Sequence, residues 1–293
     1  MKKLTIVSLC IVLALVTQPG CERRRNTHED LDATLWMQTS AEYQAACRQA
    51  YRLARQQLAA ALKDSNWSAD LVQQAQLTQQ PTSASGLTPA VILDVDETVL
   101  DNSPYQARTV RSNGGFGIDS WHAWVREANA KPVPGVLEFV KAARELGVEV
   151  YFVTNREVVV ENATRRNLEA LGLSLPNAPD RILSKHERDA WSSDKSTRRE
   201  FVGSRHRILL LIGDDLNDFV SVGFKPTPEA RRELARQHAK QWGTKWISLP
   251  NANYGGWERS VYNWEDSASD AIKLQRKQLA LNLAEDDSEK AEE

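Results

Sequence analysis

Cysteine is scarce in this chain, and its scarcity limits how the fold can be held together. The 293 residues contain three cysteines, at positions 10, 21 and 47. Cys10 lies in an N-terminal apolar run, so a framework of several disulfides is excluded. Cys47 falls among apolar residues at helical spacing and is predicted to be a small, buried, free side chain.

The chain also lacks an excess of either charge. It has 37 Lys and Arg against 39 Asp and Glu, a net charge of −2 and a pI near 6.3. This balance provides no net positive charge that would indicate binding to nucleic acid. The composition, 41% hydrophobic and 26% charged, is ordinary for a soluble globular protein. The length suits one large domain with an addition, or two modest domains.

Histidines at metal-ligand spacing are absent, as are internal repeats. His28, His186, His206 and His238 fit no ligand pattern and are predicted at the surface. His122 stays open between packing and substrate contact.

The N-terminal apolar run is too short to span a bilayer comfortably. Residues 4–16 follow Lys2 and Lys3, and this arrangement predicts that residues 1–20 are a secretory signal peptide. Gly20-Cys21 resembles a bacterial lipoprotein cleavage site with Cys21 lipidated, although Gln18 departs from the leucine-like residue expected there. We expect an outer-membrane lipoprotein of a Gram-negative bacterium, facing periplasm or surface. Simple secretion, with a possible Cys21–Cys47 disulfide, is the alternative.

The flanking regions are predicted to be mainly helical or polar. Residues 21–34 indicate a tether, and apolar residues at helical spacing predict a helix over 35–62. The helical N-terminal region, 35–89, is expected to pack on a cap. Residues 266–293 indicate a C-terminal helix followed by an acidic tail. The long helix could also pack on a partner, which leaves a homodimer open.

Between these regions, strands alternate with helices. This alternation predicts a Rossmann-like parallel sheet flanked by helices, an α/β fold. Ligands of such sheets bind beyond the carboxyl ends of the strands. Polar clusters follow three of the predicted strands: Asp94 with Asp96, Thr154-Asn155-Arg156, and Asp214 with Asp215.

An inserted segment, residues 102–132, interrupts the alternation and is predicted to form a small cap over the site. It carries Trp121 and Trp124, and a later Gly-rich loop carries Tyr254 and Trp257. These four aromatic side chains are candidate substrate-binding residues, because aromatic faces can stack on a nucleobase. The alternative is that they bury the cap and the adjoining helices.

Two carboxylates end the first strand of the sheet. Residues 90–93 are apolar, and Asp94 and Asp96 follow. An unpaired buried charge is costly, so this pair needs compensation, and a cation with a phosphate would supply it.

Four ordered motifs carry a family resemblance. Asp94-x-Asp96-x-Thr98, Thr154, Lys195 and Gly213-Asp214-Asp215-x-x-Asp218 resemble the haloacid dehalogenase superfamily of phosphotransferases. The string Leu-Asp-Val-Asp-Glu-Thr-Val-Leu-Asp-Asn-Ser-Pro-Tyr at 93–105 narrows the resemblance to the class C bacterial acid phosphatases of subfamily IIIB, which include lipoprotein 5′-nucleotidases. The resemblance implies the haloacid dehalogenase fold over 90–265, with a small, mostly helical cap.

It also implies roles for individual residues. Asp94 would be the nucleophile that forms an aspartyl-phosphate, and Asp96 the general acid and base. Mg²⁺ would lie on Asp94, Asp214 and the main-chain carbonyl of Asp96. Phosphate would be bound by Thr154, Asn155 and Lys195.

Some assignments remain open. Lys185 is a rival to Lys195. Asp218 is expected to orient Lys195 or a metal-bound water. Asp215 departs from the usual Asn or Thr and is placed behind the metal ligands. Glu97 and Asp101 are interpreted as acids at a helix start.

The predicted function is an exported Mg²⁺-dependent acid phosphatase that hydrolyses phosphomonoesters, with nucleoside 5′-monophosphates as the favoured substrates. One alternative is a broad phosphomonoesterase for sugar or other small phosphates. The other is a surface lipoprotein that captures a planar ligand without catalysis. In each case the partner is a small molecule and not nucleic acid.

Overall fold

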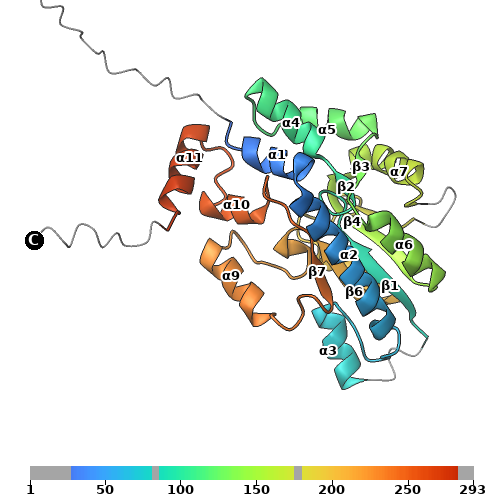
Figure 1. Cartoon of the computed structure of the whole chain (residues 1–293). Helices are drawn as coiled ribbons and strands as arrows, with labels where there is room; N and C mark the ends of the chain where they lie inside the picture. Colours follow the sequence, from blue (N-terminus) through green and yellow to red (C-terminus); the bar gives the residue numbers. More distant parts are fainter. Residues whose placement is uncertain (1–27, 81–85, 175–179, 283–293) are drawn as a thin grey trace, which may run out of the picture.

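The protein is built around one parallel sheet. The computed structural model describes residues 28–80, 86–174 and 180–282. The sheet has the strand order β5-β4-β1-β6-β7 (Figure 1). Its strands are β1 (Thr88–Leu93), β4 (Glu149–Glu157), β5 (Ile182–Lys185), β6 (His206–Gly213) and β7 (Trp246–Ser248). The α/β fold predicted from the sequence is confirmed.

Strand β1 lies at the centre and pairs in parallel with β4 and β6. Leu93 is opposite both Phe152 and Ile212, so the carboxyl ends of the three strands meet at one edge. Because helices cover both faces, these strands are continuous apolar runs instead of alternating polar and apolar residues.

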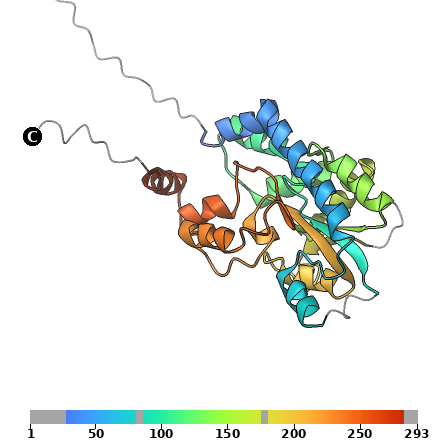
Figure 2. The ribbon, with the colours of Figure 1, turned by 60° about the horizontal axis from the view of Figure 1, so that its bottom comes forward.

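The two faces of the sheet belong to two hydrophobic clusters. Val91 and Leu93 of β1 pack in the larger cluster, and Ala90 and Ile92 pack in the smaller one. Helices α2 (Ala41–Ala61) and α6 (Val136–Glu145) cover the first face. On the second face lie α8 (Ser196–Gly203) and α3 (Leu71–Gln79), as Figure 2 shows.

The N-terminal region is not one continuous helix. Helix α1 (Leu31–Thr39) ends before Ser40, whose backbone is extended. The Ser40 side chain accepts a hydrogen bond from the Tyr43 N–H at 3.0 Å and so caps the start of α2. Helix α1 contacts α4 (Ser103–Ser112) of the cap, whereas α2 contacts α6, β6 and β7. Most of this region therefore packs on the sheet domain. Cys47 on α2 is fully buried and free.

The inserted segment forms a small helical cap on a two-stranded base. Its elements are β2 (Leu100–Asp101), α4 (Ser103–Ser112), α5 (Ile118–Glu127) and β3 (Lys131–Pro132), with β2 and β3 antiparallel. Helix α5 contacts α7 (Glu161–Ala170) and the short helix η2 (Val158–Val160). The cap therefore lies beside the end of β4.

The remaining helices follow β6. They are η3 (Leu216–Asp218), α9 (Pro228–Gln237), α10 (Gly256–Val261) and α11 (Asp270–Leu279), and α11 lies at the periphery (Figures 1 and 2). Within the described ranges, no helix is both long and apolar enough to cross a membrane. The predicted signal peptide, Cys21 and the acidic tail lie outside those ranges.

Candidate active site

The centre of the site is an ion-paired lysine between two buried carboxylates. Lys195, immediately before α8, hydrogen-bonds through Nζ to Asp94 Oδ1, and it lies 2.6 Å from Asp218 Oδ1. Burial alone would lower the pKa of Lys195, but Asp218 and Asp94 together raise it above its usual value. Lys195 is therefore a fixed cation. Its rival Lys185 instead pairs with Glu157 at 3.4 Å.

Asp94 extends the sheet by one residue beyond β1. Its N–H donates to the Ile212 carbonyl at 2.9 Å, and its side chain lies at the strand edge with the residue only 8% exposed. Burial raises the pKa of Asp94 to about 7, an effect that Lys195 opposes and Asp218 reinforces. The carboxylate therefore needs more positive charge than Lys195 provides if it is to ionise fully at neutral pH.

Three carboxylates meet at this point in a geometry that suits a metal ion. Ligand oxygens of Asp94, Asp214 and Asp218 all lie within 4.8 Å of one another. Burial, followed by the charges of Asp94 and Asp218, raises the pKa of Asp214 well above its usual value. Thr98 Oγ1 donates to Asp214 at 3.1 Å and Asn251 Nδ2 at 2.9 Å. An oxygen-only set of crowded carboxylates fits a hard divalent cation such as Mg²⁺.

Asp96 is held by two side chains. Arg156 Nε and Asn102 Nδ2 each donate to Asp96 Oδ1 at 2.9 Å. Arg156 is nearly fully buried and also donates to Asn102 Oδ1 at 3.2 Å, which closes the triangle. The motif spacing does not predict these two roles, although both residues lie inside or next to the motifs. The Asp96 carboxylate is thereby fixed in orientation.

Glu97 differs from its interpretation as a helix-start acid. Its backbone has a φ of 55°, and its side chain is buried. Tyr254 Oη donates to Glu97 Oε2, and the Asn102 N–H donates to Oε1 at 3.0 Å. Burial, followed by the charge of Asp96, raises the pKa of Glu97 to about 8. Asp101 does lie at the start of α4, where it accepts from the Ser103 N–H at 2.8 Å.

An arginine that belongs to none of the four motifs holds the backbone and side chains at the end of β4. Arg198 of α8 is fully buried and donates to the Thr154 carbonyl and, at 2.7 Å, to Asn155 Oδ1. Thr154 is fully buried and lies two residues after Phe152, which pairs with the last residue of β1. The Asn155 side chain also donates to the Ser193 carbonyl at 3.1 Å. The side chain therefore ties β4 to the loop before α8, while the residue itself is exposed.

The four candidate aromatic residues have different environments. Trp121 lies edge-on to Tyr105, and the Arg156 guanidinium lies 5.5 Å from its ring centre. Trp124 lies on cap helix α5, but it is only 5% exposed, and its Nε1 donates to Asn102 Oδ1 at 2.9 Å, which agrees with the alternative that it buries the cap. It therefore contributes to holding Asp96 and has no free ring face. Trp257 is 45% exposed.

Two further polar residues of the prediction lie beside the site. The buried His122 of cap helix α5 has Nε2 3.5 Å from Glu157 Oε2 and so contacts the end of β4. Asp215 faces away from the Asp94 cluster and accepts from the Gly256 N–H at 2.7 Å.

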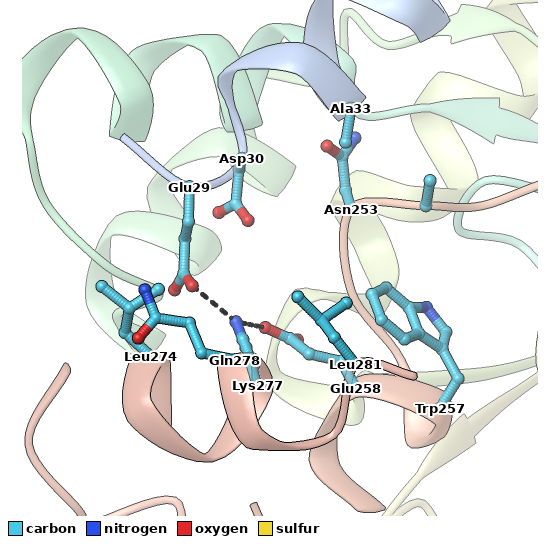
Figure 3. A pocket seen from close by; sticks show the side chains of 11 residues that line it. Glu29, Asp30, Ala33, Asn253, Trp257, Glu258, Leu274, Lys277, Gln278 and Leu281 are labelled. Carbon is cyan, nitrogen blue, oxygen red and sulfur yellow. Dashed lines mark hydrogen bonds and ion pairs between the residues drawn. The ribbon is translucent and has the colours of Figure 1, made fainter. Parts of the chain in front are cut away.

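Trp257 also lines a separate pocket of about 300 Å³ (Figure 3). Helices α1, α10 and α11 form it, and Lys277 bridges Glu29 and Glu258 across it, at 2.8 and 2.6 Å. None of its lining residues belongs to the four motifs. The pocket is therefore distinct from the carboxylate cluster.

Comparison with known proteins gives one consistent family. Residues 23–257 match the profile described as HAD superfamily, subfamily IIIB (Acid phosphatase). The solved class C acid phosphatase from Bacillus anthracis is 32% identical, with a TM-score of 0.73 over 88% of this chain and 99% of that one. The same enzyme with tungstate bound is 31% identical, with a TM-score of 0.73 over 89% and 99% of the chains.

A curated plant protein matches a shorter part. The stem 31 kDa glycoprotein of Glycine max is 24% identical over 138 residues, which are 44% of this chain and 51% of that protein. The chain thus spans about half the length of this relative.

Proposed function

Because the chain belongs to the acid phosphatases of the HAD (haloacid dehalogenase) superfamily, subfamily IIIB, we propose that it hydrolyses phosphate monoesters at the Asp94 cluster, with Mg²⁺ as cofactor and nucleoside 5′-monophosphates as favoured substrates. The observation that carries this proposal is Asp94 at the end of the central strand, paired with Lys195 beside two further carboxylates. The family resemblance predicted from the four motifs is confirmed.

Asp94 and Asp214 would hold the metal ion, with Asp218 beside them. The raised pKa values of Asp94 and Asp214 reflect crowded negative charge, which a divalent cation would neutralise. When bound, the ion supplies positive charge that allows an anionic carboxylate to approach an anionic phosphate.

In the first step, a carboxylate oxygen of Asp94 attacks phosphorus. A new O–P bond forms while the bond from phosphorus to the leaving oxygen breaks, and Asp96 gives its proton to that oxygen. Arg156 and Asn102 keep the Asp96 carboxyl in place for this transfer. Lys195 and the Thr154 hydroxyl lie at the same edge, where they can stabilise the phosphoryl oxygens.

In the second step, Asp96 takes a proton from water, whose oxygen attacks phosphorus. The O–P bond to Asp94 breaks, so inorganic phosphate leaves and the Asp94 carboxylate is restored. Asp96 therefore acts first as acid and then as base, which a single oriented carboxyl group can do.

The favoured substrate class rests on the aromatic side chains around the cluster. Trp121 lies on cap helix α5, and Trp257, which is 45% exposed, lies at the start of α10. Stacking contributes roughly 1–3 kcal/mol per base and tolerates every base. The tungstate complex of the Bacillus anthracis enzyme supports binding of a tetrahedral oxyanion in this fold.

We also propose export with a lipid anchor at Cys21. The proposal rests on the apolar run, residues 4–16, and the Gly20-Cys21 pair. Mass spectrometry of the mature N-terminus tests it: an acylated Cys21 is expected, and an unmodified Cys21 or an uncleaved leader would overturn it.

The activity is tested by phosphate release from the purified protein, with Mg²⁺ and with EDTA. Asp94→Asn is expected to lower kcat by at least about a thousandfold, because it removes the nucleophile. Asp119→Asn, an exposed acid on cap helix α5, is the matched control and should match wild type. Wild-type protein that is inactive with Mg²⁺ and with other divalent ions would contradict the proposal.

The substrate class is tested separately. A nucleoside 5′-monophosphate should have a higher kcat/KM than a hexose phosphate. Equal values would favour the alternative, a broad phosphomonoesterase.

A further inference from the structure

Asp215 follows a metal-site carboxylate but bonds in another direction. Its Oδ1 accepts from the Asn217 N–H at 2.9 Å and so begins helix η3. Its Oδ2 accepts from the Gly256 N–H at 2.7 Å and from Arg231 Nη2 at 3.2 Å. Both oxygens of Asp215 are therefore engaged by protein donors and are not needed as metal ligands.

These contacts bring together three segments that are separate in sequence. Arg231 lies on α9 and is 8% exposed, Asp215 follows β6, and Gly256 is the first residue of α10. A Cβ atom at Gly256 would lie 2.8 Å from Arg231 Cζ, and one at Gly255 would lie 3.2 Å from Asp215 Oδ2. Gly255 also has a φ of 145°. The glycine pair thus permits the close approach of this backbone.

The segment that ends at Gly256 carries the late aromatic residues; we call residues 251–257 the aromatic loop. At its start, Asn251 Nδ2 donates to Asp214 Oδ2 at 2.9 Å. At its end, the Gly256 N–H donates to Asp215 Oδ2. Between these points, Tyr254 Oη bonds to Glu97. Two consecutive carboxylates, Asp214 and Asp215, therefore hold the two ends of one loop.

Trp257 depends on the same anchor. It directly follows Gly256, and its Nε1 donates to the Tyr254 carbonyl at 3.2 Å. Any movement of the Gly256 backbone would therefore move the Trp257 ring. The pairing with Arg231 makes the anchor charge-assisted, and such hydrogen bonds are stronger than neutral ones.

We propose that Asp215 and Arg231 are positioning residues that fix the aromatic loop and thereby set the affinity for substrates with a planar leaving group. The substrate part rests on the proposed phosphatase function. The anchoring part rests only on the contacts between β6, α9 and α10. Asp215 then acts through the loop backbone and touches neither the metal ion nor the phosphate.

The experiment removes Arg231, the partner of Asp215 on α9, which lies outside the 214–218 motif. Arg231→Met is compared with Arg232→Met, which removes the exposed neighbour that pairs with Glu229 on the same helix. Amide hydrogen exchange of residues 250–257 is measured in the full protein. Arg231→Met should exchange about tenfold faster there, the factor expected for losing one charged hydrogen bond. Arg232→Met should match wild type.

Kinetics provide the second measurement. Arg231→Met should raise KM for p-nitrophenyl phosphate about tenfold, keep kcat within about threefold, and leave KM for glycerol phosphate unchanged. Arg231→Lys, which keeps the cation beside Asp215, should restore most of the affinity. Asp215→Ala should give the same pattern as Arg231→Met.

Each contrary result has a separate meaning. If the amide hydrogens of residues 250–257 exchange at the same rate in Arg231→Met and Arg232→Met, Arg231 does not anchor the aromatic loop. A faster loop with an unchanged KM for the aryl substrate refutes its role in substrate affinity. A large fall in kcat at constant KM in Asp215→Ala would place Asp215 at the reacting atoms instead of behind the loop. Lack of any phosphatase activity in wild type refutes the proposed function, whereas hydrogen exchange still decides on the anchor.

Discussion

The buried Glu97 carboxyl should make the metal-free protein less stable as pH rises. In the unfolded chain this group ionises near 4.5, whereas burial, followed by the charge of Asp96, raises its pKa to about 8 in the folded protein. Between these values the folded state holds a proton that the unfolded state has lost. Rising pH therefore favours unfolding over this range.

Glu97→Gln replaces the ionisable carboxyl by a neutral amide, so it measures how much the titration of Glu97 changes the free energy of unfolding. From the two pKa values, the ionisable side chain costs the folded state roughly 1 kcal/mol at pH 5, about 3 at pH 7 and about 4 at pH 8. The stability of Glu97→Gln relative to wild type should therefore increase by about 2 kcal/mol from pH 5 to pH 7. A constant offset from the altered hydrogen bonds to Tyr254 and Asn102 does not affect this difference.

The assay is urea unfolding at several pH values in EDTA, with stability compared at each pH. Glu127→Gln is the control: Glu127 is exposed and paired with Arg108, which lowers its pKa. Its replacement should give no gain that grows with pH. A Glu97→Gln difference that stays constant from pH 5 to pH 8 would mean that Glu97 is ionised in the folded protein, and the reasoning would be refuted.

Two further predictions concern the ion pair at the centre of the site. Because the pKa of Asp94 is raised to about 7 without metal, Mg²⁺ must displace its proton at low pH. The Kd measured by calorimetry should therefore rise at least about 25-fold from pH 7.5 to pH 5.5, because burial also raises the pKa of the second ligand, Asp214. A constant Kd would contradict this. Lys195→Met leaves Asp94 and Asp218 buried without their cation, so the unfolding free energy at pH 8 should fall by about 3–5 kcal/mol. The loss should be smaller at pH 5, where Asp94, whose pKa is raised by burial, can protonate. A loss below about 1 kcal/mol at pH 8 would show that the pair is not buried as described.

The sheet and the nucleophile could be predicted because their signals are local. Apolar runs ending in polar clusters indicate strand ends, and parallel strands bring those ends together. The order of residues along the chain is therefore enough to place Asp94, Thr154 and Asp214 at one edge. Lys195 is distinguished from Lys185 only through the family motif, because Lys185 ends β5 and Lys195 follows the same strand. The ion pairs of Lys195 confirm its position in the cluster.

The supporting residues could not be predicted because their partners are distant in sequence. Arg198 meets Thr154 and Asn155 across 44 and 43 positions, and Tyr254 meets Glu97 across 157. Neither pairing leaves a periodic pattern. Trp124 shows the opposite error: an aromatic residue in a cap invites assignment to the substrate, but its indole N–H is bonded inside the fold, as is common for buried tryptophan.

The hydrogen bond between Thr34 Oγ1 and Asn253 Oδ1, 3.1 Å long, joins α1 to the aromatic loop across 219 positions. Tyr51 Oη of α2 likewise donates to the Thr98 carbonyl at 2.6 Å. Helix α1 therefore leaves the ribosome long before its partner in the aromatic loop is made. Contacts of such separation are slow to form, so we expect the aromatic loop to dock on α1 late in folding, after β7 (Trp246–Ser248) has completed the sheet.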